Sequence, residues 1–384
     1  MLNRIFNLIE QIDIKPIKLE ARYCTRVISS KSSCSSCIDI CPQNAISIIN
    51  KELKIDFNKC NNCGLCTTSC PNNVFELEKN SDAAVLNKAQ ENFNTDHSLL
   101  INCQAAIEEK NSVQIECLGR LSERMLLKLL FIGADLIWLK PGQCAKCQLK
   151  SGRALIEEIV HNCNLLLKRY FDESRVFIST KRPNFTPNAF GFRNSEFTED
   201  ELNSSGIGRR EFINKLKQES VNGIKSLLTF EQKKEKEQKN SIAKAKIKRQ
   251  ELLSLIKRLE ENAIEVNEDD LSSLFWKLEF DGDCDFCQVC TTLCPNGVLS
   301  TIDEESEKKI MANHKLCTNC GLCKDVCYKQ QINIKKDLNH NLNNSEQEVI
   351  VGLKKVCNEC QKEFYTAKQD KKTCVFCDNS EGIL

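Results

Sequence analysis

Short runs of consecutive apolar residues alternate with helical patterns in the middle of the chain. Four runs have the length and composition of buried strands: 99–103, 113–117, 135–139 and 175–178. Between the later runs, apolar residues recur at helical spacing over 122–132 and 152–167. This alternation of strands and helices predicts a small α/β domain with a parallel sheet, which we place at residues 97–180.

Shorter segments near both ends predict antiparallel hairpins. Residues 45–49 and 53–57 flank a polar turn, and residues 298–302 and 309–312 form a looser pair. We therefore expect a small α+β unit on each side of the middle sheet, at residues 20–80 and 278–336.

The segment 181–277 has the pattern of a linker. It begins with a loop-rich stretch up to residue 205, and apolar residues recur at helical spacing within 209–261. A Lys/Glu/Gln block at 231–249 has a positive excess but no interleaved aromatic residues, so we expect a solvated helix rather than a nucleic-acid site. A second polar linker is expected at 337–347.

Charge and hydropathy exclude several classes of partner. The chain has 54 Lys and Arg against 53 Asp and Glu, which gives no global attraction to nucleic acid or to an anionic membrane. The chain has no run of about 18 apolar residues, so we predict no membrane span. Residues 1–20 lack the apolar core of an export signal, so we expect a cytoplasmic, reducing location.

Cysteine changes this picture, because the chain has 25 cysteines and only four histidines. In a reducing compartment, dense cysteine indicates metal ligands rather than disulfides. The cysteines fall into four groups, and the first and third groups are internal repeats of each other. The groups lie within residues 24–70, 103–163, 284–327 and 357–377.

The third group contains two runs of the form C-x2-C-x2-C-x3-C, followed by Pro295 and Tyr328 respectively. In two-cluster ferredoxins the fourth cysteine of such a run ligates the other cluster. This rule assigns one [4Fe–4S] cluster to Cys284, Cys287, Cys290 and Cys327. It assigns a second to Cys317, Cys320, Cys323 and Cys294.

The first group contains one complete run and one that has Lys31 where its first cysteine is expected. The same rule assigns one cluster to Cys60, Cys63, Cys66 and Cys41. Cys24 is the candidate for the missing ligand, so the other cluster would be held by Cys24, Cys34, Cys37 and Cys70. The alternative is a three-iron cluster or a water-ligated fourth iron, with Cys24 as a spare thiol.

These runs and hairpins resemble the bacterial dicluster ferredoxin family, over about residues 20–80 and 278–336. The resemblance implies pseudo-twofold βαβ halves and, in both segments together, four [4Fe–4S] clusters. An iron held entirely by protein thiolates and cluster sulfide has no open position for a substrate, so the expected role is one-electron relay.

The middle domain has its own cysteine set. Cys103 and Cys117 each end an expected strand, and Cys144 and Cys147 follow the next one. Carboxyl ends of parallel strands meet at one sheet edge, where ligands of open α/β sheets bind. Four thiolates there predict a [2Fe–2S] or [4Fe–4S] cluster, with zinc or structural cysteines as the alternative. Cys163 is expected in a helix core.

Stretches 115–120, 133–135 and 142–147 resemble the delta subunit of methyl-viologen-reducing hydrogenase, over about residues 97–180. The resemblance implies a small iron–sulfur cluster that passes electrons between a hydrogenase and a heterodisulfide reductase. The stretch between Cys103 and Cys117 is short for that family and the final cysteine pair is close, so the type of cluster stays open.

The last group forms two C-x2-C knuckles. Four thiolates at this spacing suit a tetrahedral Zn²⁺ or a single rubredoxin-like iron, and we favour zinc. Phe364 and Tyr365 between the knuckles fit the hairpin of a zinc ribbon, which we place at residues 350–384. The expected ligands are Cys357, Cys360, Cys374 and Cys377.

Together these patterns predict an α+β multidomain protein: two ferredoxin-like dicluster modules, a small parallel α/β domain between them, a helical linker and a C-terminal zinc ribbon. We expect an electron-transfer protein or subunit with two cubanes, a middle cluster and two more cubanes. Its partner would be a flavoprotein, a hydrogenase or a reductase subunit. The alternatives are a catalytic reductase of a disulfide or sulfur substrate at the middle cysteines, and a redox-sensing adaptor.

Overall fold

The computed structural model describes residues 16–171, 173–184, 248–261, 274–337 and 346–378. Several expectations fall outside these residues. They concern the loop-rich stretch from residue 185 to 205, the linker from there up to residue 247, which contains most of the basic block, and the polar linker at 338–345.

The N-terminal unit consists of two antiparallel strand pairs and short helices. The predicted hairpin is present as β2 (Ile46–Ile49) and β3 (Glu52–Ile55). A second pair joins β1 (Ile17–Leu19) to β4 (Phe75–Leu77), so the unit begins before the predicted boundary at residue 20. Four short helices complete it: η1 (Ala21–Tyr23), α2 (Thr25–Ile28), α3 (Ser36–Asp39) and α4 (Leu65–Ser69).

The unit that follows the linker repeats this arrangement. The predicted hairpin is present as β10 (Leu299–Asp303) and β11 (Glu307–Ala312). β9 (Trp276–Phe280) pairs antiparallel with β12 (Ile332–Lys336), as β1 does with β4. Its short helices are α11 (Val289–Leu293), η5 (His314–Leu316) and α12 (Leu322–Val326).

The C-terminal segment shares a sheet with this second unit. β13 (Gln347–Val356) pairs with β14 (Glu363–Thr366) on one side and with β11 on the other, in the order β10-β11-β13-β14. Short helix α13 (Val375–Asp378) follows. The segment predicted as a separate ribbon at 350–384 is therefore joined by backbone hydrogen bonds to the unit before it.

The middle unit contains the predicted parallel sheet, in the order β6-β5-β7-β8. Its strands are β5 (Ser98–Cys103), β6 (Ser112–Ile115), β7 (Leu136–Lys140) and β8 (Val176–Ile178). The predicted helices are α6 (Glu123–Phe131) and α7 (Ser151–Phe171). Three further elements were not predicted: α5 (Asp82–Glu91), η2 (Leu118–Arg120) and η3 (Cys144–Lys146).

A helix over residues 248–261 packs on the middle unit and extends its core. Its apolar side chains Leu255, Ile256 and Leu259 are buried with α6 and α7. Charged side chains are also buried at this contact, where Glu251 pairs with Arg124 and Lys128 of α6. The helical pattern predicted for this part of the linker is therefore present, and it docks a distant segment onto the sheet domain.

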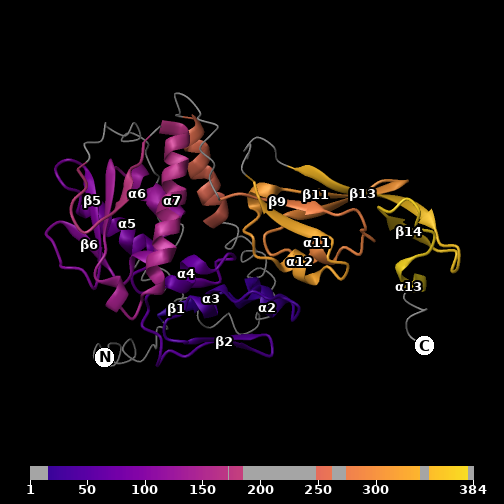
Figure 1. The fold of residues 1–384 in the computed structure, drawn as a ribbon, viewed down its shortest axis with the longest axis horizontal. Coiled ribbons are helices and arrows are strands. Elements are labelled where there is room, and N and C mark those ends of the chain that lie inside the picture. The colour runs from indigo at the N-terminus through magenta and orange to yellow at the C-terminus, as the bar shows by residue number, and fades with distance from the viewer. Residues whose placement is uncertain (1–15, 172, 185–247, 262–273, 338–345, 379–384) are drawn as a thin grey trace, which may run out of the picture.

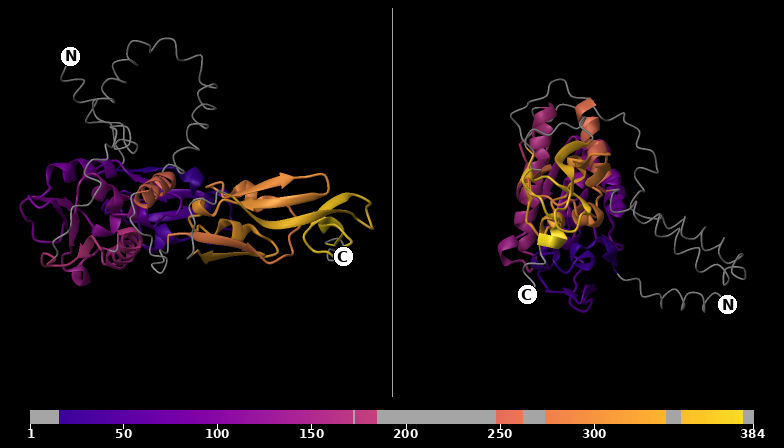
Figure 2. Two further views of the ribbon diagram at one scale, coloured as in Figure 1. Left: turned by 90° about the horizontal axis from the view of Figure 1, so that it is seen from above. Right: turned by 90° about the vertical axis from the view of Figure 1, so that its right-hand side faces the viewer.

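The spatial order of the units differs from their order in the chain. In Figure 1 the α/β unit lies at one end, the N-terminal unit in the centre, and the second unit with its extended sheet at the other end; Figure 2 shows the same order from above. The Ser33 backbone N–H and hydroxyl both donate to Asp325 across the boundary between the two cysteine-rich units, at 2.7 and 2.9 Å. The α/β unit, which lies between these units in sequence, does not separate them in space.

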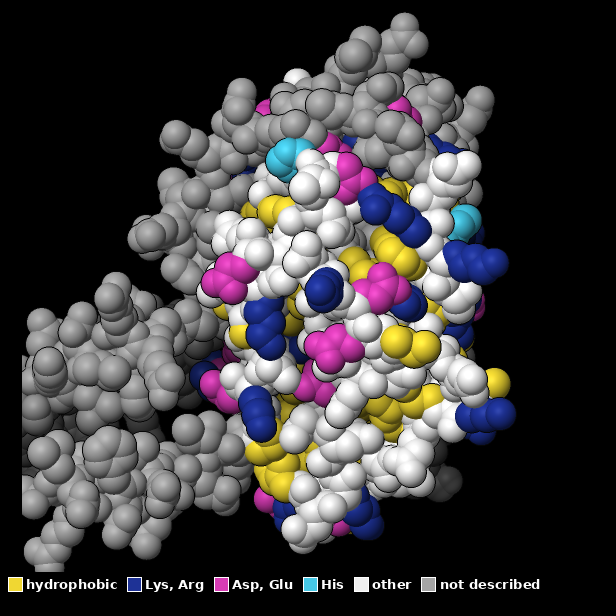
Figure 3. All heavy atoms as spheres, turned by 90° about the vertical axis from the view of Figure 1, so that its left-hand side faces the viewer, with side chains coloured by type: hydrophobic (Ala, Val, Ile, Leu, Met, Phe, Trp, Pro, Cys, Tyr) yellow, Lys and Arg dark blue, Asp and Glu magenta, His cyan; other side chains and the backbone are white. Residues whose placement is uncertain are grey.

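Surface features add little to this architecture. On the described part of the end face in Figure 3, acidic and basic side chains are interspersed with small apolar areas. Within the described ranges, no helix has the length and apolar character that crossing a membrane requires.

We predict that Glu251→Ala lowers the free energy of unfolding by about 3–5 kcal/mol, because it leaves buried cations on α6 without this carboxylate. Arg124 and Lys128 have side chains only 5% and 2% exposed. The measurement is the urea midpoint of the full chain. The matched control is Glu261→Gln, which disrupts an exposed pair with Lys257 and should change stability by less than about 1 kcal/mol. Equal effects of the two variants would contradict the prediction.

Candidate metal centres

Three cysteine loops share one unusual backbone conformation. In each complete C-x2-C-x2-C loop, the residue before and the residue after the second cysteine have positive φ. The pairs are Asn62 and Gly64, Phe286 and Gln288, and Asn319 and Gly321. Such turns aim successive backbone N–H groups into a concavity that favours negative charge. The Phe286 N–H, for example, donates to the Cys284 sulfur at 3.4 Å.

The fourth cysteine of every run starts a second repeated turn. The residue three positions later has positive φ and donates its N–H to the cysteine carbonyl, after Cys41, Cys70, Cys294 and Cys327. One position further on, N–H groups donate to the sulfurs of Cys41, Cys294 and Cys327 at 3.3, 3.3 and 3.4 Å. Tyr328 therefore replaces the usual proline without changing the turn.

In the second unit the sulfurs form two groups that mix the runs. Cys290 interacts electrostatically with three other thiols, those of Cys284, Cys287 and Cys327. Cys323 interacts with those of Cys317, Cys320 and Cys294, and more weakly with Cys290 of the first group. Each group thus contains the fourth cysteine of the other run.

The N-terminal unit has the same exchange, and it includes Cys24. The Cys37 sulfur interacts with three thiols, those of Cys70, Cys24 and Cys34. The Cys66 sulfur interacts with those of Cys63, Cys60 and Cys41, and with Cys37. No residue from Lys31 to Cys37 has positive φ, so the incomplete run does not form the repeated loop. Cys24 comes to this group instead from the start of α2, where it is buried.

Burial makes these thiols hard to ionise without a cation. It is the largest cause that raises the pKa of Cys37, Cys290 and Cys320 to about 12, and neighbouring thiols act in the same direction. A bound metal ion reverses this effect, because it stabilises the thiolates directly. At neutral pH these thiols are therefore protonated in the absence of a metal ion, and binding one would release their protons.

The middle cysteines converge at the carboxyl edge of the parallel sheet. Cys103, Cys117, Cys144 and Cys147 line one small cavity. The Cys117 thiol interacts with Cys63 of the N-terminal unit as well as with Cys103 and Cys144. Cys63, Leu65 and Cys117 also form one buried cluster. The middle site thus adjoins the Cys60–Cys66 loop directly. Cys163 is fully buried in α7, outside this set.

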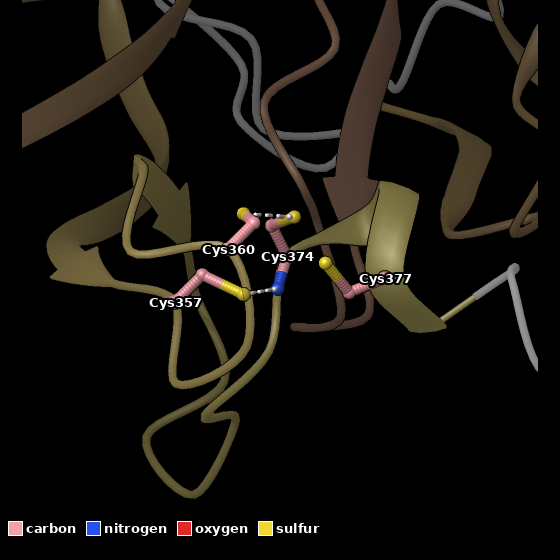
Figure 4. Close-up of side chains that lie close together, drawn as sticks. All are labelled: Cys357, Cys360, Cys374 and Cys377. Carbon is pink, nitrogen blue, oxygen red and sulfur yellow. Dashed lines mark hydrogen bonds between the residues drawn. The ribbon is translucent and has the colours of Figure 1, made fainter.

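The four C-terminal sulfurs are much closer together, as Figure 4 shows. Their ligand atoms all lie within 4.8 Å of one another, and the sulfurs of Cys360 and Cys374 are 3.7 Å apart. Tetrahedral zinc with bonds of about 2.3 Å places its sulfurs about 3.8 Å apart. Among the described residues no other group of potential ligands is this compact. The ribbon quartet therefore fits one ion, and the wider groups leave room for polynuclear centres.

Contacts connect the ribbon to the nearest quartet. Lys371 pairs with Asp285 at 2.9 Å, and the Ala367 N–H donates to the Cys284 carbonyl at 3.1 Å. Gly352 lies against Phe286, where a Cβ would be 2.1 Å from the ring. The ribbon thus packs on the Cys284–Cys290 loop.

Sequence patterns missed three polar residues beside the quartets. Asn72 and Asn296 are buried and hydrogen-bond each other at 3.1 Å across the unit boundary. Both follow a Cys-Pro pair, so the internal repeat was the signal that could have found them. Arg249 reaches the same region, donates to the Lys315 carbonyl at 2.8 Å and interacts with the Cys317 thiol.

The first cysteine group matches a known protein family. Residues 32–74 match the 4Fe-4S dicluster domain family. This match supports iron–sulfur electron transfer as chemistry of the chain, and it covers the incomplete run together with the complete one.

A curated protein is similar to this chain over a segment of about the same length as the family match. Pyruvate synthase subunit PorD of Methanothermobacter marburgensis is 37% identical over 46 residues, which are 12% of this chain and 53% of that protein. The chain thus spans about half the length of the curated relative it matches.

We predict that Gly152→Ala disrupts the boundary between the middle site and α4. Its Cβ would lie 2.5 Å from the Cys117 sulfur and 3.0 Å from Leu65, so α7 or the thiol must shift. We expect a loss of about 1–3 kcal/mol of stability from overpacking, measured by urea unfolding, together with less bound iron per chain. Lys150→Ala, an exposed neighbour, is the control. A gain in stability, as for alanine in an open helix, would contradict this prediction.

Proposed function

We propose that the chain is a multi-cluster iron–sulfur electron-transfer subunit. The observation that carries the proposal is the grouping of thiols from different runs into quartets. In this proposal four [4Fe–4S] clusters are held by Cys24, Cys34, Cys37 and Cys70; by Cys41, Cys60, Cys63 and Cys66; by Cys294, Cys317, Cys320 and Cys323; and by Cys284, Cys287, Cys290 and Cys327. A fifth centre is held by Cys103, Cys117, Cys144 and Cys147.

Such clusters supply reversible one-electron chemistry when bound. The protein's own part is to hold the thiols in place and to adjust the charge around them. The left-handed turns direct backbone N–H groups at the sulfurs, and each quartet has at least one buried cysteine. Both factors set the reduction potential of a cluster without opening a position for a substrate.

A relay must exchange electrons with partners at its ends. Cys287, in the quartet beside the ribbon, is exposed, and Cys144 and Cys147 at the opposite end are partly exposed. The spatial order of the units supports a path with these two sites as its ends (Figure 1). The relative named above is a subunit of pyruvate synthase, which supports a protein partner in a complex.

The ribbon has a structural role in this proposal. Zn²⁺ held by Cys357, Cys360, Cys374 and Cys377 would stabilise a small domain with little core of its own. Backbone N–H groups around Cys357 lower the pKa of its thiol to about 6, which prepares it for a cation at neutral pH. A ribbon fixed against the Cys284–Cys290 loop could shape the docking surface for a partner.

Catalysis on a sulfur substrate at the middle site has less support. The cavity between its thiols has a volume of about 20 Å³. Pockets for small-molecule ligands are roughly 300–1,000 Å³. The four thiols therefore suit a buried centre better than an organic disulfide.

Anaerobic iron, sulfide and zinc analysis of the purified chain tests the proposal. We expect about 16 irons from four cubanes, roughly two to four more from the middle site, and about one zinc. Reduced samples should show EPR signals from several interacting clusters. Few irons with several zincs would overturn the relay, because the quartets would then be structural.

A second prediction concerns Cys24. Cys24→Ala should convert one N-terminal cluster to a three-iron form or lose it, because Cys24 is the fourth thiol near Cys37. Iron content and the EPR spectrum of the oxidised chain measure this. Cys163→Ala, which removes a buried thiol outside every quartet, is the control and should keep all the iron. An unchanged iron content in Cys24→Ala would show that Cys24 is a spare thiol.

A further inference from the structure

Asn72 lies at the boundary between the two cysteine-rich units and is only 2% exposed. It follows Cys70 and Pro71, and its counterpart Asn296 follows Cys294 and Pro295. Buried amides are retained where their hydrogen bonds are made, because an unpaired amide is costly inside a protein. The hydrogen bonds of Asn72 therefore indicate why a buried amide stands at this position.

The contacts of Asn72 reach both units. Asn72 follows the candidate ligand Cys70 by two residues, and its side chain acts to lower the pKa of the Cys320 thiol against the effect of burial, as an N–H group directed at the sulfur does. The side-chain oxygen also accepts from Asn296 at 3.1 Å and from the Thr318 hydroxyl at 3.2 Å. Through Thr318, two residues before Cys320, and Asn296, two residues after Cys294, the Asn72 amide is fixed beside candidate ligands of the second unit.

The amide nitrogen is oriented by a further contact within the N-terminal unit. It donates to the Tyr23 carbonyl at 3.1 Å, in the residue just before Cys24. Asn296 donates to Thr318 as well as to Asn72, at 2.9 Å, which closes a buried polar network. The amide plane is therefore held from both sides of the boundary.

We propose that Asn72 is the positioning residue of the junction between the two dicluster units. It holds the Cys70 and Cys320 thiolates on either side of one amide, and it raises the reduction potential of the cluster that Cys320 would hold. The inference rests on the proposed function. It places the electron crossing at this pair of ligands, rather than through the α/β unit.

The direction of the effect follows from charge. A reduced cluster carries one more negative charge than the oxidised one, so an N–H group directed at its sulfur stabilises the reduced state. In the proposed relay, one electron, provided by a one-electron donor protein, would pass between the clusters that Cys70 and Cys320 would hold. No bond and no proton changes in this step.

The internal repeat supplies a matched control. Gln43 follows Cys41 and Pro42, at the position in the other half of the same unit that Asn72 occupies after Cys70 and Pro71. Within the part of the chain that the structure describes, it makes no side-chain hydrogen bond to the second unit. Leucine at either position replaces an amide by an apolar side chain of similar size.

The experiment is an EPR-monitored redox titration of the full chain carrying Asn72→Leu or Gln43→Leu. We expect Asn72→Leu to shift the equilibrium of one cluster about tenfold towards the oxidised state, which is about 59 mV for one electron. Gln43→Leu should leave the potentials of the second unit's clusters unchanged. Unaltered potentials in Asn72→Leu, with full iron content, would overturn the proposal.

A second variant covers the case in which Asn72→Leu fails to assemble its clusters. Thr318→Val removes one donor that orients the Asn72 amide and keeps the size of the side chain. It should lower the same potential by a smaller factor, and no change would count against the role of Asn72. Failure of the proposed function is distinguishable, because the unsubstituted chain would then lack cubane signals altogether.

Discussion

Crowded, buried thiols are the constraint on which the rest of this structure depends. Each quartet concentrates sulfur atoms in a partly buried place, and burial raises the pKa of Cys37, Cys290 and Cys320 to about 12. Four thiolates cannot remain together in such a place without a compensating cation. The turns, short helices and strand pairs of both cysteine-rich units bring backbone N–H groups to the same sulfurs, and so contribute to the same balance of charge.

The quartets also explain why such small units can be ordered. Each has two short strand pairs and helices of three to five residues, which provide little apolar core. In the proposed ligand sets, exchange of the fourth cysteine would tie the two halves of a unit together, since each half would complete the thiol set of the other. A metal centre in such a site would therefore stabilise the fold as well as serve the chemistry.

Packing between the units places the candidate centres in a sequence of neighbours. Cys117 lies near Cys63, Cys66 near Cys37, and Cys323 near Cys290. Asn72 joins the two cysteine-rich units between the second and third of these contacts. The arrangement differs from the chain order because helix 248–261 returns to the α/β unit and leaves the two cysteine-rich units free to meet directly.

Local sequence by itself determined the cysteine runs, the two hairpins and the parallel strands, because those signals lie in spacing and alternation over a few residues. It also indicated which fourth cysteine crosses to which run, since that exchange follows from the run itself. Only tertiary structure decided that the Cys24 thiol lies near that of Cys37, that the ribbon shares a sheet through β11 and β13, and that Asn72 hydrogen-bonds Asn296 and Thr318. These contacts join residues far apart in the chain or depend on a single residue without a periodic pattern, so they follow from packing that no local pattern encodes.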